Sequence, residues 1–174
     1  MESDIVYERK AITSLLEDPH PDIMLVTPVT KFQDQYYIGC DEEGFLVKCS
    51  IEKNEIITET GDEPAGELVG IHKISNKFYL DMLEVYQYRQ RLEEMYHNGE
   101  HPEKTGYEFI LEDVATWAVP TAGIADENGR YPAYPSGGLL STRPLYVLTK
   151  DNLQWYEIDD ENDLKFAEQN IAIQ

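Results

Sequence analysis

The most specific chemical pattern in this sequence is the run His97-Asn98-Gly99-Glu100-His101. It matches the H-x-x-E-H pattern of inverted zinc peptidases, in which two histidines one helical turn apart bind zinc and the glutamate polarises the bound water. The two imidazoles converge only if a helix continues through the run. Gly99 lies inside the run and Pro102 follows it, so we expect the helix to end there and the protein to bind no metal.

Carboxylates gather in two short runs that could bind a cation or face a basic partner. Residues 41–43 lack the alternating ligand pattern of a calcium loop, and Gly44 after them favours a tight turn. Residues 159–163 lie where the last helix should begin, a position at which acidic side chains complement the helix dipole. We predict that both runs also face a partner, through Asp41, Glu42, Glu43, Asp159, Asp160, Glu161 and Asp163.

Patterns for covalent and nucleotide chemistry are absent from the sequence. Ser136-Gly137-Gly138 lacks the G-x-S-x-G elbow of hydrolases, and Cys49 is expected on a buried strand face without a base nearby. No phosphate-binding glycine pattern opens a helix, so we expect no cofactor. With 34 acidic residues, no catalytic carboxylate pair can be selected. We therefore expect a protein that is not an enzyme; the enzymatic alternative is a small enzyme with a carboxylate site covered by residues 118–142.

The net charge of −20, from 34 acidic and 14 basic side chains, is the strongest signal in the sequence. A small soluble domain is typically kept soluble by a net charge of about 2 to 8 in magnitude. The excess therefore either adapts the protein to its environment or has a use. Because such a chain repels phosphate, direct binding to nucleic acid or to an anionic membrane is disfavoured. We predict instead that it binds the basic, nucleic-acid-binding surface of another protein.

Residues 118–142 are the longest stretch without apolar periodicity, and prolines and glycines interrupt them throughout. We expect an exposed and mobile loop there, which in a compact domain is usually functional or disordered. Tyrosine, tryptophan and arginine are enriched in binding hot spots. We predict as anchors for the partner Arg130, Tyr131 and Tyr134 in this loop, and Trp155 beyond it. The alternative is that these aromatic side chains pack back on the domain.

Apolar periodicity predicts the elements that position these residues. A short helix is expected within residues 4–17, ended by Pro19 and Pro21. Strands joined as an antiparallel meander are expected at 24–30, 36–40, 45–51 and 56–60. Alternation along the third of these strands predicts one buried face made of Phe45, Val47, Cys49 and Ile51.

The second half of the chain predicts one long helix, from a cap at Ser75 or Asn76 to Gly99, followed by residues 107–119, which suit helix and strand equally. A second hairpin is expected to join 145–149 to 153–158, and a last helix to cover residues 160–171. The predicted fold class is α+β, an antiparallel meander and hairpins packed with one long helix and short N- and C-terminal helices.

Cysteine usage and the N-terminal residues predict the compartment. Cys40 and Cys49 are the only cysteines, and neither a secretory signal nor an apolar run of about 18 residues is present. We expect two free thiols in a single cytoplasmic domain over residues 1–174. The leading hypothesis is an acidic inhibitor that mimics nucleic acid, of the anti-restriction, anti-CRISPR or nuclease-immunity type. The other alternative is an unassigned housekeeping interaction domain.

Overall fold

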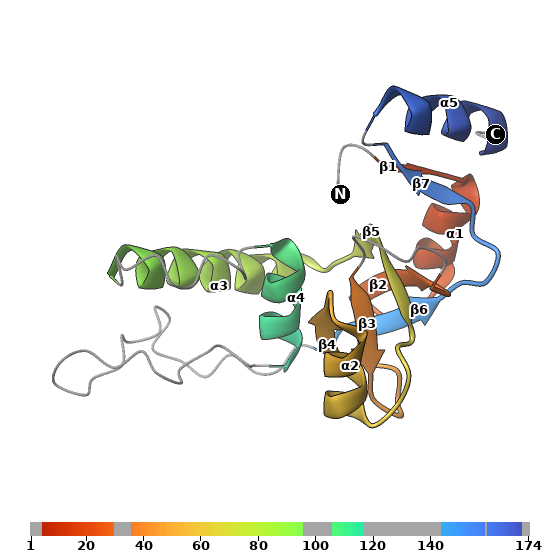
Figure 1. Cartoon of the computed structure of the whole chain (residues 1–174). Coiled ribbons are helices and arrows are strands. Elements are labelled where there is room, and N and C mark those ends of the chain that lie inside the picture. The colour runs from red at the N-terminus through yellow and green to blue at the C-terminus, as the bar shows by residue number, and fades with distance from the viewer. Residues whose placement is uncertain (1–4, 30–35, 96–105, 117–143, 159, 172–174) are drawn as a thin grey trace, which may run out of the picture. The chain divides into compact units, whose positions relative to one another are not determined.

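The fold is described from a computed structural model of the chain (Figure 1). The structure describes residues 5–29, 36–95, 106–116, 144–158 and 160–171. The chain divides into two compact units, residues 1–74 with 145–174, and residues 75–144. The elements in chain order are β1 (Ile5–Tyr7), α1 (Arg9–Glu17), β2 (Ile23–Thr27), β3 (Tyr37–Cys40), β4 (Leu46–Ser50), α2 (Lys53–Thr60), β5 (Gly66–Lys73), α3 (Asn76–Met95), α4 (Tyr107–Thr116), β6 (Tyr146–Thr149), β7 (Trp155–Glu157) and α5 (Glu161–Asn170).

The predicted α+β class is confirmed, and the main sheet of the first unit is mixed. Five strands lie in the order β4-β3-β5-β2-β6, and β2 pairs with β6 in parallel while the other ladders are antiparallel. All five residues of β2 are buried. A strand that is buried along its whole length reads as a continuous apolar run, as Ile-Met-Leu-Val does here.

The predicted meander is wrong in its order and in its last strand. Strands form near 24–30, 36–40 and 45–51 as expected, but β5 lies between β2 and β3. The predicted strand at 56–60 is helix α2, with Ile56 fully buried and Gly61 closing the helix in the left-handed conformation at φ 81°. The β-branched residues of this segment favour a strand locally, but the packing of Ile56 and the glycine cap favour the helix.

The predicted second hairpin is also wrong, because β6 and β7 belong to different sheets. β6 pairs with β2, whereas β7 pairs with β1 in a separate antiparallel ladder. The predicted N-terminal helix is correct from Arg9 onward, but residues 5–7 form β1. The wrong hairpin and the missed strand β1 have one cause: β1 pairs with β7 from the other end of the chain, and such a distant pairing leaves no pattern in the local sequence.

The first unit has its core between α1 and the sheet. Seven buried side chains form this cluster: Ala11, Leu15, Ile23, Leu25, Val69, Ile71 and Leu153. At the other edge of the sheet Cys49 is fully buried as predicted, but Leu46 is also buried and Ile51 is 60% exposed. A register shift between Gly39 and Cys40 interrupts the β3–β4 ladder, and such a bulge breaks simple alternation.

The cysteines lie in the β3–β4 ladder, where Cys49 is opposite Ile38 and Cys40 is opposite Leu46. Neither is therefore opposite the other, and both are free thiols in the structure. Burial raises the pKa of the Cys40 thiol, and the charges of Asp41 and Asp62 raise it further.

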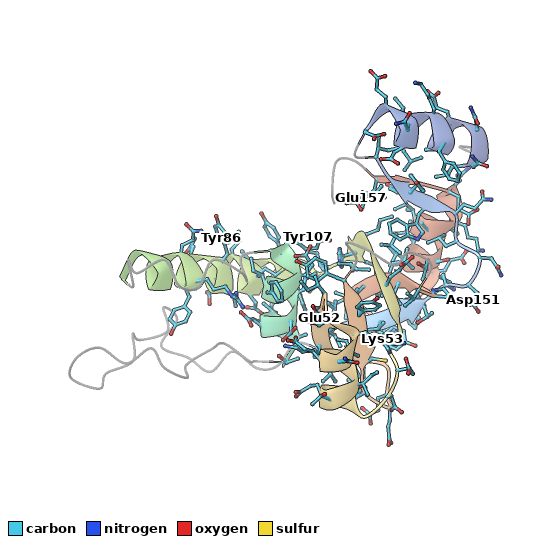
Figure 2. All side chains as sticks on the ribbon, in the orientation of Figure 1. Glu52, Lys53, Tyr86, Tyr107, Asp151 and Glu157 are labelled. Atoms are coloured by element: carbon cyan, nitrogen blue, oxygen red, sulfur yellow. The ribbon has the colours of Figure 1, made fainter. Side chains whose placement is uncertain are left out.

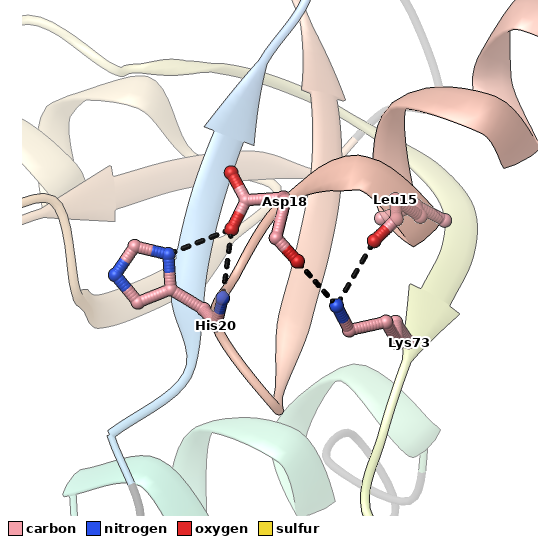
Figure 3. A network of polar contacts seen from close by, with 4 residues as sticks. All are labelled: Leu15, Asp18, His20 and Lys73. Atoms are coloured by element: carbon pink, nitrogen blue, oxygen red, sulfur yellow. Dashed lines mark hydrogen bonds and ion pairs between the residues drawn. The ribbon is translucent and has the colours of Figure 1, made fainter.

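Partly buried polar contacts fasten the end of α1 to the sheet (Figure 3). The Lys73 ammonium donates hydrogen bonds to the backbone carbonyls of Leu15 and Asp18, at 3.0 and 2.7 Å. A helix leaves its last carbonyls without helical partners, and a cation there also complements the helix dipole. Lys73 on β5 thus serves as the cap for a helix whose own last turn has no basic residue.

His72, next to Lys73 on β5, makes the stability of the sheet depend on pH. Its Nε2 atom is buried, and burial lowers the pKa of the imidazole from 6.5 to about 3. Protonation therefore favours the unfolded chain, so the stabilisation is complete above pH 6.5 and is lost as the pH falls toward 3. We expect the free energy of unfolding to fall by up to about 1.4 kcal/mol per pH unit in this window.

Urea titrations between pH 6.5 and about 4.5 measure this slope above the range in which carboxylates titrate. The substitution His72→Gln should remove most of it while leaving the slope at lower pH. An unchanged slope in this variant would show that other groups cause the acid sensitivity.

The second unit contains α3 and α4. Ser75 caps α3 as predicted, because its hydroxyl accepts a hydrogen bond from the Phe78 amide at 3.1 Å. The predicted end of this helix at Gly99 lies outside the described residues. The sequence left the segment 107–119 undecided between helix and strand. Its first ten residues form helix α4. Arg89 on α3 binds Asp113 on α4, with 2.6 Å between Nε and the carboxylate.

No helix among the described residues combines the length and the apolar character needed to span a membrane. Whether the two units form the single predicted domain stays a prediction.

Candidate functional site

The acidic run at 41–43 lies on the turn between β3 and β4, as predicted. Asp41 holds the turn, because its carboxylate accepts hydrogen bonds from the amides of Glu43 and Phe45 at 3.0 and 2.9 Å. Gly44 completes it with φ of 85°. Glu42 and Glu43 are exposed. Asp41 therefore has a structural role in the turn, while the charges of Glu42 and Glu43 face solvent.

Helix α2 adds further carboxylates beside this turn, since α2 contacts both β3 and β4. Asp62 and Asp41 both act on the pKa of the Cys40 thiol, so carboxylates from the end of α2 and from the turn converge there. Figure 2 shows Glu52 and Lys53 at the start of α2. We define the α2 surface by its exposed carboxylates: Asp41, Glu42, Glu43, Glu52, Glu55, Glu59, Asp62 and Glu63. Lys53 on α2 forms an ion pair with Glu63, with 2.6 Å between Nζ and the carboxylate.

The second acidic run begins α5, and its predicted capping role is confirmed. Asp160 accepts hydrogen bonds from the amides of Asn162 and Asp163, and Asp163 accepts one from the Asp160 amide in return. The amides of Asp163 and Asn162 hold the pKa of Asp160 below its usual 3.8. Glu161 is exposed beside this capping box, and Asp159 lies outside the described residues.

Trp155 lies in a partly open pocket of about 380 Å³ between β7, α5 and the end of β2, which we call the β7–α5 pocket. Tyr156 and Phe166 line it with their rings 4.8 Å apart between centroids. The Trp155 indole N–H donates a hydrogen bond to the Thr27 hydroxyl at 3.1 Å, and that hydroxyl lies 3.4 Å from the fully buried Glu67 carboxyl group. The indole is thus held in one orientation.

The sequence-based reasoning found one residue of this pocket and missed the others. Phe166 is 49% exposed on α5, and Leu164 on the same helix is 45% exposed. An exposed aromatic residue in an otherwise polar C-terminal helix was the available signal for Phe166. Thr27 had no such signal, because it contacts Trp155 across 128 positions of sequence. The predicted anchors Arg130, Tyr131 and Tyr134 lie outside the described residues, as does the loop at 118–142.

Asp18 and His20 form an acid–imidazole pair in the first unit (Figure 3). The His20 ring nitrogen Nδ1 lies 2.7 Å from the Asp18 carboxylate, and its ring stacks on Tyr146 at 3.8 Å. Burial raises the pKa of Asp18, but hydrogen bonds from the amide and ring of His20 outweigh burial and hold it below 3.8. Phe45 packs edge-on against the same imidazole. We assign this group to packing between α1, β6 and the β3–β4 turn.

Within the described residues, no group of three histidine, cysteine, aspartate or glutamate side chains could hold a metal ion. The histidine run at 97–101 lies outside them.

No known protein-family model matches the chain. Among solved structures, the chain is similar to the inositol-1-phosphate CTP transferase from T. maritima, with a TM-score of 0.49 and 16% identity over 97% of this chain and 55% of that one. The chain therefore spans about half the length of that protein. At this level of similarity, neither its fold nor its activity is carried over to the chain.

Proposed function

We propose that this protein binds a basic, nucleic-acid-handling protein and occupies the surface that would otherwise hold DNA or RNA. The observation that supports the proposal is the net charge of −20. Duplex DNA has about one negative charge per 1.7 Å, so the surfaces that bind it are strongly positive. A compact acidic protein is drawn to such a surface by the same long-range attraction.

The distribution of the charge supports the same proposal. The first unit contains 23 of the 34 acidic side chains and 8 of the 14 basic ones, which leaves it with −15 of the net −20. On the α2 surface the described acidic side chains are exposed, and Lys53 neutralises only one of them directly. Exposed carboxylates at the start of α5 extend the acidic character to a second element. Anti-restriction, anti-CRISPR and nuclease-immunity proteins are the kinds of inhibitor that fit this proposal.

The experiment that tests it starts with capture of a partner from nuclease-treated lysate, followed by measurement of its association rate at several salt concentrations. The substitution pair Glu42→Gln and Glu43→Gln removes two charges from the α2 surface. The pair Glu17→Gln and Glu168→Gln removes two exposed charges elsewhere. We expect the first pair to slow association more than the second, with little change in dissociation, because exposed charges act on encounter.

Equal rates for the two pairs, or rates that ignore salt, would contradict a binding role for the α2 surface. Carboxylates that cluster beside residues 118–142 and titrate with shifted pKa values would favour the enzymatic alternative instead.

A further inference from the structure

We propose that the β7–α5 pocket binds an arginine or lysine side chain from an extended basic segment of the partner. The inference rests on the proposed function and deepens it, because it names the chemistry that holds the complex after the charges have brought it together. Three features of the pocket support the proposal: its aromatic lining, the fixed orientation of the Trp155 indole, and the hydrogen-bond acceptors at its rim.

Three aromatic side chains line the pocket, those of Trp155, Tyr156 and Phe166. Trp155 and Tyr156 are partly exposed and Phe166 is 49% exposed, so part of each side chain reaches solvent. The face of an aromatic ring has negative potential and attracts cations, with tryptophan the strongest of the three. A pocket built from these rings discriminates in favour of guanidinium or ammonium groups and against carboxylates and phosphates.

Hydrogen bonds orient Trp155 for this role. Its N–H donates to the Thr27 hydroxyl, which is itself placed to donate to the Glu67 carboxyl group. Donation from the indole N–H shifts electron density toward the ring, which strengthens the attraction between the ring face and a cation. Because Thr27 and Glu67 are buried, the indole stays in this orientation without a ligand.

The rim of the pocket offers acceptors to a cation. Asn170 lines the pocket, and its amide nitrogen donates a hydrogen bond to the Phe166 carbonyl at 2.7 Å. This bond turns the Asn170 amide so that its oxygen is left to accept a hydrogen bond. Gln154 is exposed on the same rim. The lining contains no charged residue, so a bound cation meets no repulsion there.

Charge complementarity identifies the occupant as a basic peptide segment. The unit that contains the pocket has a net charge of −15, and the capping box at 160–163 adjoins α5. An isolated arginine or lysine in solution would gain from the rings alone, whereas a segment with several cations also gains from the acidic field. We therefore infer that the occupant of the pocket is an extended arginine- or lysine-rich segment of a protein.

The test uses a short arginine-glycine peptide and the same peptide with citrulline in place of arginine. Citrulline keeps the shape of the side chain and removes its charge. Trp155 becomes the sole tryptophan in the Trp117→Phe background, so its fluorescence and its indole N–H resonance report binding at the pocket. We expect the arginine peptide to change both signals and the citrulline peptide to change neither.

The substitution Phe166→Leu should weaken binding of the arginine peptide by about 3- to 10-fold, the loss expected for one ring in a cation–π contact. Leu164→Ala is the matched control, because Leu164 is equally exposed on the same helix and does not line the pocket. It should leave the affinity unchanged.

Equal binding of the two peptides, or of Phe166→Leu and the parent protein, would overturn the pocket proposal. It would leave the proposed function standing, because salt-dependent binding of the whole partner does not require this pocket. Binding of free arginine methyl ester as tight as that of the peptide would point to a small organic cation as the occupant and would contradict the peptide.

Discussion

The substitution Gly66→Ala is expected to destabilise the first unit by about 3 kcal/mol or more. Gly66 begins β5, where it pairs with Ile38 on β3. A Cβ atom added there would lie 2.2 Å from the backbone oxygen of Thr27 and 3.0 Å from its carbonyl carbon. Backbone atoms cannot rotate away as a flexible side chain can, so β2 and β5 would have to separate. The separation would weaken the ladder between Thr27 and Glu67.

Gly61→Ala is the control for this prediction. Gly61 has a φ of 81°, which costs a residue with a side chain about 1 kcal/mol, but an added Cβ atom would meet nothing within 4 Å. Urea unfolding of both variants compares crowding with backbone strain. The structure predicts a clearly larger loss for Gly66→Ala, and a loss equal to that of Gly61→Ala would mean that β2 and β5 are not packed as described.

The substitution Arg89→Met is expected to cost the second unit about 3 to 5 kcal/mol. The Arg89 side chain is 15% exposed and the Asp113 side chain is 4% exposed, with 2.5 Å between Nη2 and the carboxylate. Removing the guanidinium leaves a buried carboxylate without its closest cation, which is costlier than losing an exposed pair. Methionine keeps most of the aliphatic stem, so the loss reports on charge and hydrogen bonding.

Lys77→Met is the matched control in the same helix. Lys77 is 58% exposed and its ammonium lies 3.4 Å from Asp81, whose side chain is 6% exposed. Because solvent screens this ammonium and the contact is longer, its removal should cost clearly less than removal of the Arg89 guanidinium. Hydrogen exchange at the amides of α4 is the appropriate readout, because it reports the local stability of the helix that contains Asp113. Faster exchange in α4 for Arg89→Met, but not for Lys77→Met, would show that the Arg89–Asp113 ion pair holds α4 against α3. Equal exchange in both variants contradicts it.

Local chemistry was sufficient to predict the turns and caps of this fold. The turn at 41–44 and the capping box at 160–163 follow from the conformational preferences of a few adjacent residues. The cap of α3 was predicted at Ser75 or Asn76, and it is Ser75. Each of these devices is complete within about four residues, so no distant partner can override it.

Strand pairing could not be predicted in the same way. β1 is three residues long and exists because β7 pairs with it across almost the whole chain. β6 precedes β7 in the sequence and was predicted to pair with it, but β6 pairs with β2 in parallel. The turn residues 150–152 do not reveal this pairing. The β7–α5 pocket depends on both of these pairings, and this is why Trp155 was predicted without Thr27 or Phe166.

The two acidic runs contain residues with a structural role and residues whose charges are exposed to solvent. Asp41 and Asp160 accept backbone hydrogen bonds that account for their presence. The side chains of Glu42, Glu43 and Glu161 are exposed. Tests of partner binding are therefore cleaner with the second group, because substituting the first would also disturb the fold.

The most direct test of the central proposal is competition between this protein and nucleic acid for the captured partner, at about 50 and about 200 mM salt. We expect the protein to displace DNA or RNA from the partner, and its own affinity to fall at least about tenfold across this range, because exposed charges draw the two proteins together. A complex in which the partner holds this protein and its nucleic acid at the same time, with an affinity that does not change with salt, would contradict the account.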